Sequence, residues 1–148
     1  MIAQATLNDA KMLWHLEQEI FDIYNFPLSL ASFHYHIKRN RIFLYRIENQ
    51  IVGYCLWLKR KHSMRLYSMG VSPHFRNKGV AKKLLEYSLA HLDTPCFTLE
   101  VRCDNPQAIA LYERYDFKIL KSLKGYYPNE IDGYKMVKKN AITPCKKR

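Results

Sequence analysis

The sequence predicts an α/β domain in which a mixed sheet carries helices on both faces. Three observations point to this class. Helical and hairpin patterns fill the first half of the chain, strand and helix patterns alternate after Pro73, and 48% of the 148 residues are hydrophobic. A chain of this length buries roughly two-thirds of its unfolded surface, so we expect one domain at residues 1–137 and a flexible basic tail at 138–148.

Two helices, a hairpin and a further strand are expected in the first half. Asn8 or Asp9 can cap the first helix, which ends near Phe21, and Ser29 can cap the second. Runs of aliphatic, aromatic and β-branched residues predict the strands that follow, at 41–48, 51–59 and 64–71. Asn49-Gln50 is the expected turn of the hairpin.

The second half alternates helices and strands. An apolar stripe from Val80 to Leu92 predicts a helix that begins at Gly79. Asn105 and Pro106 suit the cap and the first position of another helix. The strands expected here lie at 96–102, 117–124 and 133–137.

The segment from Met69 to Ala81 carries the most information about function, because a strand leads through a short basic loop into a helix that starts at a glycine. A helix N-terminus has unpaired N–H groups and a partial positive charge, and therefore favours an anion such as phosphate. Arg76, Lys78 and Lys82 add cationic donors. The GxxxxGK[ST] loop of ATPases is absent. The alternative is a helix start beside a solvated basic face.

The pattern Arg76-x-x-Gly79-x-Ala81 resembles the acetyl-CoA signature of the GCN5-related N-acetyltransferases. The resemblance implies a mixed, mostly antiparallel sheet of about six to seven strands flanked by about four helices. It also implies that the loop and helix start wrap the coenzyme pyrophosphate, and that the preceding strand contacts the pantetheine arm. The residues it assigns to acetyl-CoA are Met69, Gly70, Val71, Arg76, Asn77, Lys78, Gly79, Val80, Ala81, Lys82 and Asn105.

Most of the chain also resembles the bacterial ribosomal-protein alanine N-acetyltransferases, which acetylate the N-terminal amine of a small-subunit ribosomal protein. The matching segments are Phe26-Pro27-Leu28-Ser29, Leu99 to Arg102, Asn105, Ala108 to Glu113 and Gly125 to Pro128. By this resemblance Phe26, Pro27, Tyr126 and Tyr127 contact the acceptor. The two tyrosines could instead form a simple aromatic turn. The chain departs from the family at Leu28, where a tryptophan is usual, at Asp116-Phe117, where the family has Gly-Phe, and at Ile131-Asp132, where it has Glu-Asp.

Acyl transfer from a thioester to an amine needs a base for the ammonium and an acid for the departing thiolate. Glu100 lies on the Thr98–Glu100–Arg102 face of its strand, where a half-buried carboxylate suits the base, and Tyr112 is the candidate acid. The family resemblance gives the same two roles. The alternatives are an ordinary ion pair of Glu100 with Arg102 and plain core packing of Tyr112.

A net charge of +11 favours anionic partners. The expected partners are acetyl-CoA and the N-terminus of an acceptor protein, a ribosomal protein by the resemblance, with no membrane and no direct need for nucleic acid. The start of the chain lacks a basic and apolar signal, so we expect a cytoplasmic protein. No cysteine or histidine spacing suggests a metal. The alternatives are an enzyme that acetylates lysine or a small amine, and a non-catalytic RNA- or ribosome-binding module.

Overall fold

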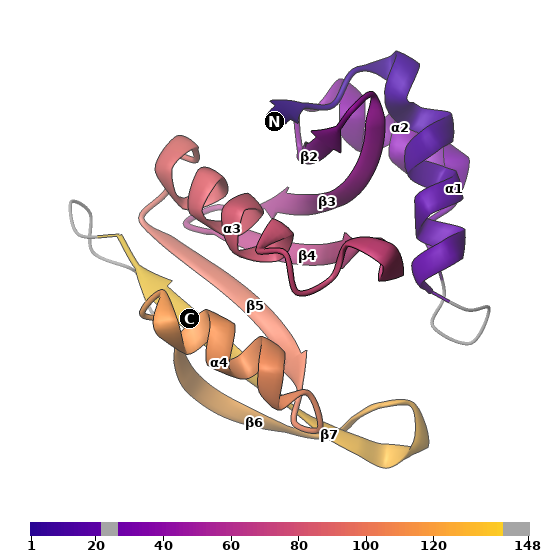
Figure 1. Ribbon diagram of the computed structural model, residues 1–148. Coiled ribbons are helices and arrows are strands. Elements are labelled where there is room, and N and C mark those ends of the chain that lie inside the picture. Colours follow the sequence, from indigo (N-terminus) through magenta and orange to yellow (C-terminus); the bar gives the residue numbers. More distant parts are fainter. Residues whose placement is uncertain (22–26, 141–148) are drawn as a thin grey trace. The chain divides into compact units, whose positions relative to one another are not determined.

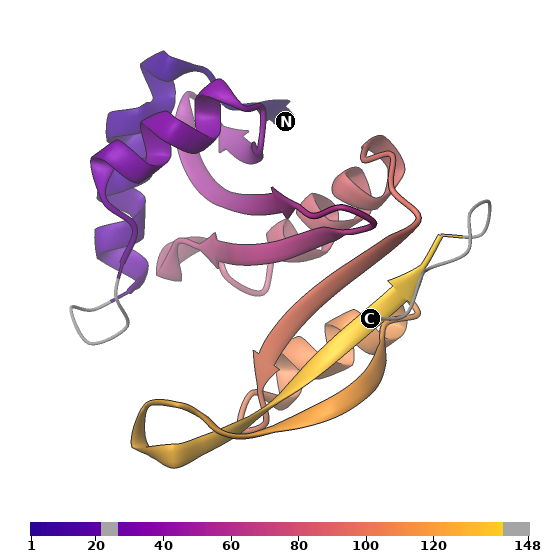
Figure 2. The ribbon, with the colours of Figure 1, turned by 180° about the vertical axis from the view of Figure 1, so that it is seen from behind.

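The computed structural model describes residues 1–21 and 27–140. The strands are β1 (Ile2–Gln4), β2 (Ile42–Ile47), β3 (Gln50–Lys59), β4 (Met64–Val71), β5 (Cys96–Arg102), β6 (Lys118–Tyr127) and β7 (Ile131–Lys139). The α-helices of the described residues are α1 (Ala10–Ile20), α2 (Leu30–Lys38), α3 (Val80–His91) and α4 (Pro106–Arg114) (Figures 1 and 2).

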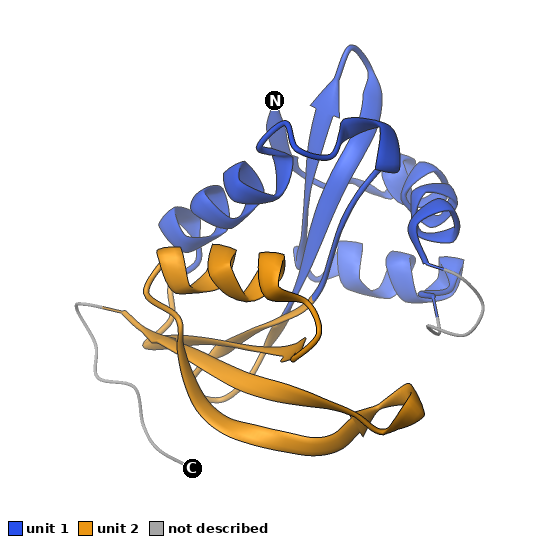
Figure 3. Cartoon of the chain, turned by 60° about the horizontal axis from the view of Figure 1, so that its bottom comes forward, with its two compact units in different colours: residues 1–57, 68–92 blue, residues 58–67, 93–148 orange. Residues whose placement is uncertain are grey.

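The seven strands are hydrogen-bonded in the order β1-β2-β3-β4-β5-β7-β6. β1–β2, β2–β3, β5–β7 and β6–β7 are antiparallel, and β4–β5 is parallel. The predicted mixed, mostly antiparallel sheet with about four helices is confirmed. The chain forms two compact units, one of residues 1–57 and 68–92, the other of residues 58–67 and the chain from 93 onward (Figure 3).

In the first unit, helices cover both faces of β3. A Cβ placed on Gly53 would lie 2.7 Å from the side chain of Val80, so α3 packs directly on the backbone there. The next residue, Tyr54, points to the other face, where its ring meets Phe33 of α2 edge-on at 5.8 Å. Both aromatic rings are fully buried. Each such burial contributes about 1.5–3 kcal/mol to folding.

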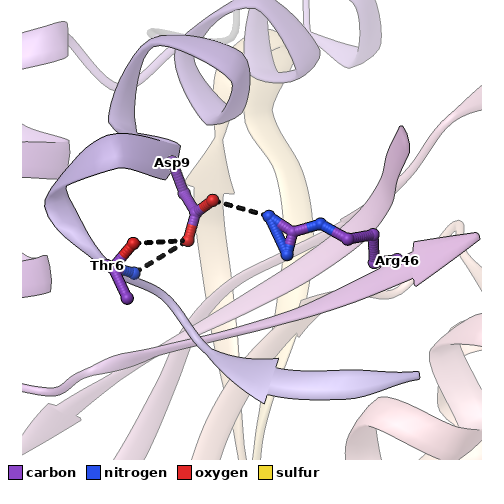
Figure 4. A network of polar contacts seen from close by, with 3 residues as sticks. All are labelled: Thr6, Asp9 and Arg46. Atoms are coloured by element: carbon purple, nitrogen blue, oxygen red, sulfur yellow. Dashed lines mark hydrogen bonds and ion pairs between the residues drawn. The ribbon is translucent and has the colours of Figure 1, made fainter. Parts of the chain in front are cut away.

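Asp9 ties the start of the first unit together (Figure 4). Its carboxylate accepts hydrogen bonds from the backbone N–H and the hydroxyl of Thr6, at 2.8 and 3.1 Å, and pairs with Arg46 of β2 at 2.6 Å. Burial raises the pKa of Asp9, but these hydrogen bonds outweigh it and leave the pKa below its usual value. The turn that precedes α1 is thereby fixed to β2.

The second unit has one helix-covered face. Leu99 and Val101 of β5 and Met136 of β7 are buried, and Tyr112 of α4 meets Phe117 at 5.9 Å. The residues that alternate with these on β5, Thr98, Glu100 and Arg102, are only half-buried. Figures 1 and 2 show α4 along one face of β5, β7 and β6, and no described helix of this unit along the other.

Local signals predicted most elements, with three corrections. β1 was not expected, and the hairpin turn has its left-handed residues at Glu48 and Asn49, one position before the predicted Asn49-Gln50. β6 and β7 are longer than predicted, because their pairing continues as far as Tyr127 and Ile131. At the other end of β7, Lys138 and Lys139 pair with Phe97 and Cys96 of β5, so they belong to the strand and not to a tail. The rest of the predicted tail from 141 lies outside the described residues.

Candidate active site

The predicted phosphate loop lies in the first unit, between β4 and α3. Val71 ends β4, a 3-10 turn at Pro73–Phe75 follows, and Gly79 caps α3 with a φ of 78°. This left-handed backbone conformation favours glycine, which has no Cβ. Because Gly79 is a glycine, the cap residue makes no side-chain hydrogen bond to the first N–H groups of α3, and a Cβ on Gly79 would meet nothing within 4 Å. The helix start thus offers donors and space to an anionic group.

Cationic and polar side chains surround this helix start. Arg76, Asn77, Lys78 and Lys82 are all exposed. Arg76 donates from Nε to the carbonyl oxygen of Val71 at 3.3 Å, which turns its guanidinium back toward the end of β4. These residues fit the pyrophosphate of a coenzyme by charge and by donor type.

Gly70 is buried just before the end of β4, between Met69 and Val71. A Cβ on it would lie 2.8 Å from the side chain of Ile20 and 3.4 Å from the ring of Tyr54. A larger residue would therefore push the Ile20 side chain of α1 away from the strand. The predicted contact strand is a closely packed part of the first unit.

Glu100 lies in the second unit, on the face of β5 that α4 does not cover. Its Oε1 accepts a hydrogen bond from Nη2 of Arg65 at 2.7 Å and another from the hydroxyl of Tyr126 at 2.6 Å. Among the described residues, Oε2 receives no hydrogen bond. The ion pair considered for Glu100 therefore exists, but its partner is Arg65 of β4. Arg102 instead pairs with Asp104 at 2.9 and 2.8 Å.

Tyr126 and Tyr127 end β6 beside Glu100. The hydrogen bond to Glu100 raises the pKa of Tyr126, and burial, the largest cause, raises that of Tyr127 to about 12. A Cβ on Gly133 would lie 2.5 Å from the ring of Tyr127, so this ring packs directly against the β7 backbone. Both phenols thus remain protonated donors at neutral pH, in strand positions and not in an isolated turn.

Tyr112 and Asn105 both belong to α4. The side chain of Tyr112 is buried and packs against Phe117, as the core-packing alternative requires. The Oδ1 of Asn105 accepts a hydrogen bond from the backbone N–H of Ala108 at 3.2 Å, which confirms its capping role. Asn105 is exposed.

A buried carboxylate in the first unit was missed by the sequence analysis. Glu17 of α1 is only 2% exposed, and it accepts hydrogen bonds from the hydroxyl of Tyr54 and from the backbone N–H of Leu28, the latter at 2.6 Å. The Tyr54 hydroxyl also contacts the Ser68 hydroxyl of β4 at 3.2 Å. Burial raises the pKa of Glu17, although the Leu28 hydrogen bond opposes this. Its position four residues after Leu13, on the apolar stripe of α1, was the available signal.

Glu17 fixes one end of the predicted acceptor loop, because it holds the backbone of Leu28. Pro27 is half-buried, and Phe26 lies outside the described residues. No group of three or more His, Cys, Asp or Glu side chains in the described parts of the chain could hold a metal. Within the same residues, no helix is long and apolar enough to cross a membrane.

Comparison with known proteins identifies the class to which this fold and site belong. Residues 10–117 match the model of the acetyltransferase (GNAT) family, and the chain belongs to that family. It is an N-acetyltransferase that uses acetyl-CoA, as the sequence resemblance implied.

Individual relatives point to N-terminal acetylation within this family, and a solved structure shares the fold of this chain. An N-alpha-acetyltransferase of Saccharolobus solfataricus is 35% identical over 121 residues, which cover 70% of this chain and 72% of that protein. A ribosomal protein bS18-alanine N-acetyltransferase of Salmonella typhimurium is 38% identical over 66 residues, 43% of this chain and 45% of that protein. The structure of the S18-alanine N-acetyltransferase from Escherichia coli superposes with a TM-score of 0.84 at 23% identity, covering 100% of this chain and 95% of that chain.

Proposed function

We propose that this enzyme transfers the acetyl group of acetyl-CoA to the α-amine of a protein N-terminus, with a ribosomal protein as the acceptor. The acceptor class is supported by the similarity to the N-alpha-acetyltransferase and the ribosomal protein-alanine N-acetyltransferase. The coenzyme supplies an activated acetyl thioester. The observation that carries the chemistry is the Glu100 carboxylate, whose Oε1 is held by Arg65 and Tyr126 and whose Oε2 receives no hydrogen bond from the described residues.

Glu100 is the proposed base. Arg65 and Tyr126 both contact Oε1 and so fix the orientation of the carboxylate. Oε2 can then take a proton from the acceptor ammonium, directly or through one water. An α-amine has an ordinary pKa near 8 against about 10.4 for lysine, so at neutral pH its proton is the easier one to remove. The ion pair with Arg65 thus positions the base and does not exclude it.

The remaining roles follow the predicted assignments. Tyr112 is the proposed acid that protonates the departing thiolate, which needs a phenol in its protonated form. Backbone groups of Met69, Gly70 and Val71 are proposed to bind the pantetheine arm and thioester carbonyl. Asn105 is a further proposed coenzyme contact, together with residues 76–82 around the helix start. Pro27, Phe26 and the two tyrosines are proposed to contact the acceptor.

Two peptides of the same sequence, each containing one lysine, test the acceptor class. One has a free N-terminus and the other a blocked one, and thiol release from acetyl-CoA is measured with each. We expect turnover with the free N-terminus and none with the blocked peptide. Equal turnover with both, or turnover with small amines alone, would refute the assignment.

Thermal unfolding with acetyl-CoA separates an enzyme from a pure RNA-binding module. A ligand that binds only the folded state stabilises it, by about 2.7 kcal/mol at a ligand concentration of a hundred times Kd, and this raises the midpoint temperature of unfolding. We expect such a rise with acetyl-CoA. No shift with acetyl-CoA, together with a shift on adding RNA, would favour the binding module.

A further inference from the structure

A row of charged residues crosses the uncovered face of the second unit. The β5–β7 register places Lys135 directly opposite Glu100, and the β6–β7 register places Lys121 directly opposite Lys135. Directly opposed residues on paired strands point to the same side of the sheet. Glu100, Lys135 and Lys121 therefore form a continuous row on one face.

No ion pair among the described residues neutralises the two lysines of this row. Like charges directly opposite each other on neighbouring strands destabilise a sheet. Neither lysine forms an ion pair within the described part of the chain, although Lys135 lies beside a carboxylate. Glu100 is engaged by Arg65, and Asp104 by Arg102. The row thus presents an uncompensated positive charge immediately beside the proposed base.

The lysines are accessible to a ligand. Lys121 is exposed and Lys135 half-buried, and α4 lies on the opposite face of these strands (Figures 1 and 2). Tyr126 and Tyr127, the proposed acceptor contacts, belong to the same face as Glu100, since one bonds to Glu100 and the other lies over Gly133 opposite Arg102. An acceptor whose amine reaches Glu100 would meet the lysines next.

We propose that the preferred acceptor is an N-terminus with acidic side chains in its first few residues. The inference rests on the proposed function, and it assigns the substrate class of the same site. Neighbouring strands lie about 4.8 Å apart, so Lys135 and Lys121 follow Glu100 at about 5 and 10 Å, and an extended peptide advances about 3.3 Å per residue. With the α-ammonium at Glu100, the carboxylates of acceptor positions two to four reach the two lysines.

Three peptides that differ only at positions two to four test the preference. All begin with a free alanine and continue with aspartate and glutamate, with asparagine and glutamine, or with lysine and arginine. We expect kcat/KM to be roughly fivefold higher for the acidic peptide than for the neutral one, and lowest for the basic one. The preference should shrink as salt rises from 20 mM to 500 mM, because salt screens exposed charges.

Variants assign the preference to the row. Lys121→Gln combined with Lys135→Gln should bring the ratio of acidic to neutral peptide close to one. Lys138→Gln is the control, because it removes a lysine charge from β7 opposite Phe97, on the other face, where Lys138 lies 4.0 Å from Asp116. The control should keep the wild-type ratio. Partial unfolding of a variant lowers the rates with both peptides by the same factor, so the ratio of the two rates does not change.

Failure of the inference and failure of the proposed function give different results. Equal rates for the three peptides, or an equal loss of preference in the control, would overturn the acidic acceptor and leave N-terminal acetylation intact. No acetylation of any peptide would refute the proposed function. Loss of RNA oligonucleotide binding in the double variant, with the peptide ratio unchanged, would assign the lysines to nucleic acid and overturn the inference.

Discussion

Replacement of Glu100 by glutamine separates its role as a base from its role in an ion pair. The amide oxygen can still accept the hydrogen bond from Tyr126, so the side chain keeps one of its two contacts. The ion pair with Arg65 is lost, and so is the oxygen that would take the proton. The variant is close in shape to the wild type and differs mainly in charge and basicity.

The two roles predict effects of very different size. A positioned general base contributes about 10²–10⁴ in rate, which corresponds to about 2.7–5.4 kcal/mol of activation free energy. The side chains of Arg65 and Glu100 are 26% and 19% exposed, and an ion pair at such a site contributes about 1 kcal/mol to stability. We therefore expect Glu100→Gln to lower kcat at pH 7 at least a hundredfold while the free energy of unfolding changes by about 1 kcal/mol.

The assay is thiol release from saturating acetyl-CoA with a peptide that has a free N-terminus, measured from pH 6 to pH 9.5. The rate of Glu100→Gln should rise with pH through the pKa of the acceptor amine, near 8, because the amine then loses its proton to solvent. Tyr126→Phe is the control, since it removes one hydrogen bond and keeps the carboxylate. It should lower the rate tenfold or less. An undiminished rate for Glu100→Gln at pH 7 would remove Glu100 from the base role.

Three further substitutions test the site and its support. Glu17→Gln should make the free energy of unfolding less dependent on pH, because the raised pKa of Glu17 gives a stabilisation that is complete below its ordinary value of 4.5 and is lost as pH rises through the folded pKa. In urea unfolding, the stability of the variant relative to wild type should therefore increase from pH 4.5 to 8. A difference that stays constant with pH would contradict this. Gly79→Ala should cost about 1–2 kcal/mol in thermal unfolding, because φ is 78°, and should raise the KM for acetyl-CoA; an unchanged KM would argue against coenzyme binding there. Gly133→Ala should lower the free energy of unfolding by about 1–3 kcal/mol, because the new methyl would lie 3.0 Å from the Val101 carbonyl oxygen and against the ring of Tyr127. Wild-type stability of this variant in urea unfolding would refute that packing.

The sequence correctly predicted helix caps, the helix start at Gly79 and the alternation on one strand, which depend on residues close together in the chain. Ser29 and Asn105 were predicted as caps, and each accepts a hydrogen bond from the N–H group three residues later. Gly79 was predicted to begin a helix, and it adopts the left-handed conformation that favours glycine. The alternation on Cys96–Arg102 correctly separated the half-buried Glu100 from the buried Leu99 and Val101. These features depend on neighbours within a few positions along the chain.

The partner of Glu100 could not be predicted in this way. Arg102 was the nearest basic residue on the same strand face, but it turns toward Asp104 immediately after the strand. Arg65 is 35 positions away, and it reaches Glu100 because β4 pairs in parallel with β5 and places Arg65 opposite Thr98. Pairing register depends on the whole sheet, so it is not visible in a single segment. The three-residue strand β1 was missed for the same reason, since it exists through its pairing with β2.

The register also changes how the net charge of +11 is understood. Lys138 was assigned to a solvated tail with Lys139, yet both complete β7. In a regular strand, Lys118 and Lys121 would point to opposite faces, because side chains alternate. A register shift between Ile119 and Lys121 places Lys118 opposite Val137 and Lys121 opposite Lys135, both on the face of Glu100. Without the extra residue in β6, one of these two lysines would lie on the opposite face; with it, both lie on the face of the proposed base. The preferred charge of the acceptor side chains is therefore a testable consequence of strand pairing.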